Sequence, residues 1–326
     1  MTRIVLVKIA GMFLVILLGW LARRRGFLAA ELTGVISRLV VEVAFPALVF
    51  TQMLRTVDLP ALKQGWASPL LCGGIIGLAW MAGCLLAPFF CPGSQRRTFV
   101  FLVAIPNWVF LPLPIAEALY GEDGVRTVLL ANAGAQLVLW SFGVWILHGA
   151  LRQSGGQLLR NTGLWATALG IAAALLIPAS RQLESGASLP AAAWPAVALV
   201  QALAVIGSLT IPLSLLAIGA QLGELNLHLH RLSRPLWGVL LGRLVVAPLG
   251  LILLVVLAAK LGFPLPEQLR MITYLIGAMP VAISCSVMAE RFGGDAALSA
   301  QGIFYSTLFS LGTVPLLFWL VQRLGW

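Results

Sequence analysis

The residues that could do chemistry in this chain are prolines and one asparagine inside apolar stretches. Pro106, Asn107, Pro112 and Pro114 lie in a run long enough to cross a membrane, and Pro280 interrupts a second run at the corresponding place in the C-terminal half. An interior proline removes a helical hydrogen bond and adds a steric clash. In hydrocarbon, the freed backbone groups are tolerated only where protein or a wet cavity satisfies them. Two broken spans at matching positions of two halves indicate the substrate site of a secondary transporter.

Half-helices that end at such breaks can hold an anion. A broken helix leaves N–H groups unpaired and puts a positive helix end inside the membrane, and both stabilise negative charge. Asn107 adds an amide donor and acceptor beside these ends. A carboxylate is therefore the expected ligand, and no basic side chain is needed to hold it. Asn107 could instead be a structural residue that bonds the broken backbone, and Trp108 could line the pocket or pack against lipid.

The candidate site draws on both halves of the chain. Gln136 is expected in the same helix bundle as Asn107, and the alternative is a structural polar residue there. The predicted substrate-binding residues are Asn107, Trp108, Gln136, Val281 and Ala282, and the predicted crossover residues are Pro106, Pro112, Pro114 and Pro280.

The composition is that of a membrane protein. Of 326 residues, 60% are hydrophobic and 10% are charged, whereas about a quarter of the residues in a soluble domain are charged. The net charge is +10, but the basic residues sit in short connections between apolar blocks. This placement is a topology signal and does not indicate nucleic-acid binding. The four cysteines and three histidines show no metal-ligand spacing, so neither a metal nor a cofactor is expected.

Ten apolar segments are candidates to cross a membrane, which takes roughly 20 residues each. They run over about 4–22, 34–53, 66–90, 98–120, 125–149, 163–179, 196–222, 236–259, 269–290 and 297–322. An arginine cluster at 23–25 follows the first segment where a signal-peptide cleavage site would have small residues, so we interpret that segment as a retained helix. The balance of Lys and Arg, ten against eight, puts the cytoplasm at this cluster and both termini outside.

An internal repeat relates the two halves. The segment 104–106 (Ala-Ile-Pro) and the turn 120–123 (Tyr-Gly-Glu-Asp) resemble 278–280 (Ala-Met-Pro) and 292–295 (Phe-Gly-Gly-Asp). In each half, this pair of motifs closes a broken helix and opens the next helix with an acidic residue, which the helix dipole favours.

The repeat predicts the architecture. Each half holds five predicted helices, and because five is odd the halves must insert with opposite orientations. Pro46 in the second helix likewise pairs with Pro212 in the seventh. We predict an all-α membrane protein of ten transmembrane helices in two inverted five-helix repeats, at 1–150 and 163–326, joined by a cytoplasmic linker at 151–162.

The same residues belong to six motifs that follow one another along the chain. They are Ser37-Arg-Leu-Val with Pro46-Ala-Leu-Val-Phe50, Ile105-Pro-Asn107 with Pro114 and Leu119-Tyr-Gly121, Gln136 with Trp140, Ile211-Pro-Leu-Ser-Leu-Leu-Ala-Ile-Gly219, Pro280 with Phe292-Gly-x-Asp295, and Ser306-Thr307 with Pro315. In this order they resemble the second, fourth, fifth, seventh, ninth and tenth helices of the auxin efflux carrier family of permeases. That family includes plant PIN auxin exporters and bacterial carriers of small carboxylates.

The resemblance implies a division of labour between helices. Helices one, two, six and seven would form a scaffold, with a homodimer contact through helices two and seven. Helices three to five and eight to ten would form a transport domain that moves like an elevator, with the fourth and ninth helices crossing at their breaks. Pro112 departs from the family, which has glycine two residues before Pro114, and should stiffen the crossover.

Two ionisable residues lie deep in predicted spans. A charged side chain is costly to place there, so such a residue is a candidate for a functional role. Glu42 and Arg243 are coupling or gating candidates, each about 12 Å from a cytoplasmic helix end at helical rise. Glu42 follows Arg38 by four residues, so a local ion pair is the simplest interpretation. The alternatives are a Glu42–Arg243 pair that locks scaffold to transport domain in one state, or a protonatable Glu42.

These observations predict a transporter of small organic anions, either mono- or dicarboxylates or auxin-like acids, in a bacterial inner membrane. An enzyme would need an intramembrane nucleophile, base or metal set, and a channel would need rings of charged pore residues; the sequence indicates neither. The expected partners are the substrate, the lipid bilayer and a second copy of the chain, with no nucleic acid. The alternative is a sodium-coupled organic anion symporter of the bile-acid type, which would need oxygen ligands where Val-Ala-Ile-Ser follows Pro280.

Overall fold

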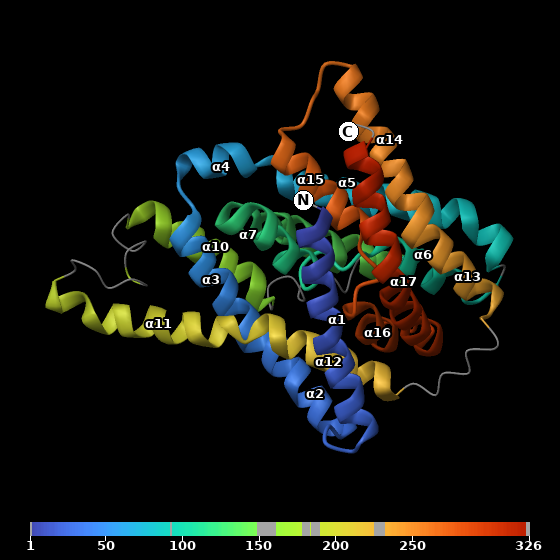
Figure 1. Cartoon of the computed structure of the whole chain (residues 1–326), viewed down its shortest axis with the longest axis horizontal. Helices are drawn as coiled ribbons and strands as arrows, with labels where there is room; N and C mark the ends of the chain where they lie inside the picture. The colour runs from blue at the N-terminus through green and yellow to red at the C-terminus, as the bar shows by residue number, and fades with distance from the viewer. Residues whose placement is uncertain are drawn as a thin grey trace.

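The computed structural model describes residues 2–91, 93–148, 161–177, 183, 190–224 and 232–323, and in this part of the chain every regular element is a helix (Figure 1). The α-helices are α1 Thr2–Arg24, α2 Ala30–Leu39, α3 Phe45–Thr56, α4 Leu59–Gly65, α5 Ala67–Phe90, α6 Arg96–Ala104, α7 Pro112–Val138, α8 Val144–His148, α10 Thr162–Leu176, α11 Trp194–Ser208, α12 Thr210–Glu224, α13 Arg234–Leu241, α14 Ala247–Lys260, α15 Glu267–Ala278, α16 Ser284–Arg291 and α17 Ala296–Arg323. A 3-10 turn, η5 Ala191–Ala193, precedes α11. The predicted all-helical class is confirmed.

Within the described residues, six helical stretches are long and apolar enough to cross a membrane: Ala30–Thr56, Leu59–Phe90, Pro112–Leu147, Trp194–Gln221, Arg234–Lys260 and Ala296–Arg323. Each of the ten segments predicted from the sequence contains one or more helices. Large apolar side chains such as Leu85, Leu176 and Leu261 are exposed, as expected where lipid is the solvent. Most of the predicted linker, residues 151–160, lies outside the described residues.

Three of these stretches contain a π-helical turn, namely η1 Val40–Ala44, η2 Leu139–Gly143 and η6 Gly242–Val246. Two of them come just before a proline, because Pro46 follows η1 and Pro248 follows η6. A proline has no N–H and clashes with the carbonyl four residues earlier, and a wider turn relieves both problems without ending the helix. Glu42 and Arg243, the two deep ionisable residues, therefore sit in matching π-helical turns.

One group of helices is built from α1, α2, α3, α10, α11 and α12. Helix α1 packs along α12, while α3 packs against α10 and α11. Figure 1 shows α3, α10 and α11 together on one side of the molecule. The close approach of α1 and α12 depends on Gly219, where an added Cβ would collide with the carbonyl oxygen of Ile16. Small residues that allow such backbone contact are typical of helix interfaces in membranes.

The second group contains α5, α6, α7 and the helices from α13 to α17. Helix α5 contacts α6, α7, α13, α14 and α15, and α17 contacts α13, α15 and α16. In Figure 1 most of these helices lie opposite α10 and α11. The buried core of this group includes every residue of α6 from Thr98 to Ala104.

The two repeated turns each contain a glycine with a positive φ angle. Gly121 has φ 58° and Gly293 has φ 76°, a left-handed region that glycine enters without a steric penalty. Gly121 divides α7 into two helices, one before the turn and one after it. Asp295, after the second turn, accepts a hydrogen bond from the backbone N–H of Leu298 at 2.8 Å and so caps the start of α17.

Candidate functional site

Two helix breaks form the centre of the candidate site. Helix α6 ends at Ala104 and α7 begins at Pro112, while α15 ends at Ala278 and α16 begins at Ser284. The four predicted prolines occupy two kinds of position. Pro106 and Pro280 lie in the broken segments themselves. Pro112 and Pro114 lie in the first turn of α7, where a missing N–H costs nothing because that donor would have no helical partner.

The two breaks pair with each other through their backbones. The N–H of Asn107 donates to the carbonyl oxygen of Pro280 at 2.8 Å, and the N–H of Ala282 donates to that of Ile105 at 3.1 Å. These bonds make one isolated antiparallel bridge between Pro106 and Val281. Extended backbone crosses extended backbone here, so each break supplies partners that the other break has lost.

Asn107 stabilises the first break with its side chain. Its Oδ1 accepts a hydrogen bond from the backbone N–H of Phe110 at 3.1 Å. The side chain is 4% exposed, yet its Nδ2 has no protein acceptor among the described residues. The acceptor half of the amide is therefore structural, and the donor half is available to a ligand.

A polar network extends from Trp108 into α7. The indole Nε1 of Trp108 donates to Oδ1 of Asn132 at 3.0 Å, and Nε2 of Gln136 approaches the same oxygen at 3.5 Å. Oε1 of Gln136 accepts from Nδ2 of Asn161 at 3.1 Å and from Nε1 of Trp140 at 3.2 Å. The structure thus links Trp108 to Gln136, and Trp108 is buried by protein.

Sequence reasoning missed Asn132, the centre of this network. Asn132 is fully buried, and its Nδ2 is a buried donor without a hydrogen-bond partner among the residues described. A signal was present, since Asn132, Gln136 and Trp140 are spaced by four and share one helix face. Asn161, which caps the start of α10 through Leu164, was missed as well.

The second break has fewer polar groups. Val281 and Ala282 are buried apolar residues, and their contribution to the crossover is backbone. The N–H of Val281 donates to Oγ of Ser306 on α17 at 3.0 Å. Ser306 in turn donates to the carbonyl oxygen of Ile303 within its own helix at 3.3 Å.

Arg243 and Glu42 lie in different surroundings. Arg243 is 0% exposed and donates through Nη1 to the carbonyl oxygen of Val103 at 3.1 Å and through Nη2 to that of Gly277. Glu42 is exposed on the surface of the chain. Within the described ranges no ion pair joins Glu42 to Arg243.

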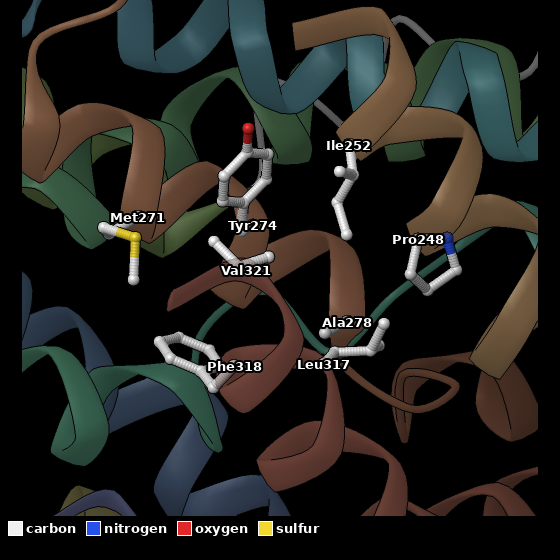
Figure 2. Close-up of a pocket in the computed structure, with 8 residues that line it drawn as sticks. All are labelled: Pro248, Ile252, Met271, Tyr274, Ala278, Leu317, Phe318 and Val321. Carbon is white, nitrogen blue, oxygen red and sulfur yellow. The ribbon is translucent and has the colours of Figure 1, made fainter. Parts of the chain in front are cut away.

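A separate small hollow lies beside α15 (Figure 2). Its walls come from α14, α15 and α17, and its lining is apolar apart from the hydroxyl of Tyr274. The lining residues are Pro248, Ile252, Met271, Tyr274, Ala278, Leu317, Phe318 and Val321. None of the predicted substrate-binding residues lines this hollow, so it does not replace the crossover as the candidate site.

Comparison with known proteins identifies the family. Residues 4–157 and 153–319 match the family model described as a membrane transport protein. An uncharacterised transporter of Methanothermobacter thermautotrophicus is 24% identical over 321 residues, covering 94% of this chain and 95% of that protein. An uncharacterised transporter of Methanocaldococcus jannaschii is 21% identical over 321 residues, covering 94% and 96% of the two chains. The chain belongs to the membrane transport protein family, and the auxin efflux carrier resemblance seen in its motifs is confirmed.

Proposed function

We propose that this multi-pass membrane transporter is a secondary carrier of small organic anions and that the paired helix breaks are its substrate site. The observation that carries the proposal is the bridge between Pro106 and Val281, which holds two half-helix pairs at one point. Irregular backbone inside a membrane protein is tolerated where it is buried in protein or lines a cavity. Discontinuous helices that meet in this way are the usual construction of a transporter's binding site.

The charge of the proposed substrate follows from the helix ends. Helices α7 and α16 both begin just after the bridge, and neither has a side-chain cap at its N-terminus. A helix N-terminus carries a partial positive charge and backbone donors that favour an anion. The Nδ2 of Asn107 supplies a further donor beside the bridge. A carboxylate is the small, planar acceptor that these groups suit best.

The proposed mechanism is an elevator with ten spans in two inverted repeats. The group containing α1, α3, α10, α11 and α12 would be the scaffold, and the group around α5, α7, α15 and α17 would carry the substrate. Support comes from the repeated features of the two halves, which are the two breaks and the turns at Gly121 and Gly293. Support also comes from the packing of each group within itself.

The proposed assembly is a homodimer in a cell membrane with both termini outside. Helix α2 and the turn that follows it expose a row of apolar side chains, including Leu32, Val35 and Leu39. Such a face suits either lipid or a second copy of the chain, and the resemblance to auxin efflux carriers favours the second copy.

The test is a binding and exchange screen with purified protein. We expect thermal stabilisation by some members of a panel of acetate, lactate, succinate, malate and indole-3-acetate, and exchange of the same compounds in proteoliposomes. Their uncharged amides should neither stabilise nor exchange. Stabilisation by amides as strongly as by acids would contradict an anion site. Exchange that requires Na⁺ would instead favour the sodium-coupled symporter of the bile-acid type.

A further inference from the structure

Arg243 has an unusual position for a charged residue. It is fully buried, and its two hydrogen bonds reach two different half-helices. Val103 belongs to the last turn of α6 and Gly277 to the last turn of α15. Both carbonyls therefore come from the turn that precedes a break. One guanidinium thus joins the two broken helices one turn away from the Pro106–Val281 bridge.

The geometry matches the electrostatics of a helix C-terminus. The last carbonyls of a helix lack intrahelical partners and carry partial negative charge, so a cation there is stabilised. Two such ends meet at the crossover, and each would repel the other without a cation between them. The planar fork of a guanidinium presents several donors in fixed directions, which lets one side chain bind both carbonyls. A lysine would bring the charge without the fork.

The fold holds this guanidinium in place. Arg243 lies in the π-helical turn η6, next to Gly242. A Cβ added at Gly242 would lie 3.0 Å from both Cγ atoms of Val103, so the missing side chain lets η6 approach α6. The arginine therefore reaches the end of α6 over a short, tightly packed distance.

The charge of Arg243 is left without a counter-ion. No carboxylate lies within 4.0 Å of its guanidinium among the residues that the structure describes. The ionisable neighbours are the buried thiols of Cys72 and Cys285. Its Nε also has no hydrogen-bond partner in the described part of the chain. Here the guanidinium depends on the partial negative charges of the two helix ends, so an anion bound nearby would stabilise the buried cation further.

We propose that Arg243 is the positioning and charge-selecting residue of the crossover. It clamps the carboxyl ends of α6 and α15, and it supplies one fixed positive charge that a substrate carboxylate neutralises. The second part rests on the proposed function, whereas the clamp does not. The consequence is selectivity, because an acid is favoured over the uncharged amide of the same shape.

Three variants test the proposal. Arg243→Met keeps the length and removes both the charge and the fork, and Arg243→Lys keeps the charge alone. The matched control is Arg234→Met, since Arg234 begins α13 in the same helical stretch and is exposed. Each purified protein is measured by thermal unfolding alone and with lactate against lactamide and succinate against succinamide.

We expect Arg243→Met to bind the acid about 10- to 100-fold more weakly and to lose its preference over the amide. Arg243→Lys should keep that preference, and Arg234→Met should match the unmodified protein. Without ligand, both Arg243 variants should unfold at a lower temperature than the control, because Arg243, unlike Arg234, joins the two half-helices.

Each outcome decides one part of the proposal. A folded Arg243→Met with the original acid preference overturns charge selection, and so does an Arg243→Lys that binds acid and amide alike. Ligand-free unfolding of Arg243→Met at the temperature of Arg234→Met overturns the clamp. If neither acid stabilises the unmodified protein, charge selection for these carboxylates fails, while ligand-free unfolding still decides the clamp. If Arg243→Met does not fold and Arg243→Lys does, the clamp is supported and the acid preference of the lysine variant decides charge selection.

Discussion

The two helix breaks share a backbone arrangement and differ in their side chains. Each donates one N–H to a carbonyl oxygen of the other, and each follows a half-helix whose end is bound by Arg243. The first break carries Asn107, which binds the backbone of its own loop, and Trp108, which is bonded to the polar network of α7. The second break carries Val281 and Ala282, and its polar partner comes from another helix. Two structural repeats of one chain can therefore differ in role, with one break binding the substrate through side chains and the other stabilising the crossover.

The difference has a physical basis in how each break satisfies its backbone. The first break uses the side chain of Asn107 within the same loop, so its amide nitrogen remains free for a ligand. The second break uses the hydroxyl of Ser306, which is both acceptor and donor and has no donor left. The residues of the second break itself, from 279 to 283, then offer only backbone groups and apolar side chains to a substrate.

The largest expected effect is that of Asn107→Ala on substrate affinity. Loss of a hydrogen bond to a charged group costs about 1.5–3 kcal/mol, or about 10- to 150-fold in the dissociation constant of the acid that the panel identifies. Val281→Thr is the matched control at the second break, with an expected change of less than about threefold, or ~0.7 kcal/mol. Equal losses in both variants, measured by titration of the thermal shift, would show that recognition is shared between the breaks.

Asn132→Leu should destabilise the first break by removing the hydrogen-bond acceptor of Trp108. The substitution leaves the indole N–H of Trp108 and the amide of Gln136 without their shared acceptor. An unsatisfied buried donor costs about 1–3 kcal/mol, so the free energy of unfolding should fall by that amount. The comparison is with Asn161→Asp, which keeps the oxygen that caps α10 and loses only the bond to Gln136 at the edge of the network. If Asn132→Leu leaves the free energy of unfolding unchanged, the hydrogen bonds of Asn132 do not stabilise Trp108 or the first break.

Ser306→Ala should have a smaller effect on the second break. It leaves one buried backbone N–H, that of Val281, without an acceptor, at a cost of about 1–2 kcal/mol. Ser310→Ala is the control in the same helix, because Ser310 is buried but donates only to the carbonyl oxygen of Thr307. The two variants are compared by thermal unfolding. A loss from Ser310→Ala as large as that from Ser306→Ala would mean that the bond to Val281 contributes no specific stability.

The positions of both breaks follow from local sequence, and much of the surrounding site does not. Pro106 and Pro280 interrupt apolar runs, so the interruption itself is readable from the chain. The pairing of the two breaks, by contrast, joins residues far apart in sequence. The partners of Arg243 illustrate the limit, since Val103 and Gly277 contribute carbonyl oxygens that every residue has. No side-chain pattern marks a carbonyl, and only the fold decides which one is near.

Local sequence also leaves open how a helix accommodates an interior proline. The segment predicted over 196–222 is divided at Leu209 into α11 and α12, and Pro212 lies in the first turn after the division. Its partner Pro46 follows the π-helical turn η1, and both prolines remain within single helical stretches long enough to cross a membrane. A proline predicts an irregularity in the turn before it, but the packing around that turn decides between a break and a widened helix.

The smallest expected effect concerns Glu42 and decides whether the breaks are controlled from outside the crossover. Similar predicted depths suggested that Glu42 pairs with Arg243 in one state of the transporter. The structure gives Arg243 two carbonyl partners and leaves Glu42 exposed, so we expect Glu42→Gln to change transport little. A double-mutant cycle combines Glu42→Gln with Arg243→Gln. If the two sites are independent, the changes in activation free energy that the single variants show in exchange rates should add to that of the double variant within about 0.5 kcal/mol. A double variant that transports better than Arg243→Gln alone by about tenfold, or ~1.4 kcal/mol, would contradict this expectation. It would mean that the clamp opens in another state and that Arg243 then meets Glu42, because an unpaired buried charge costs more than none.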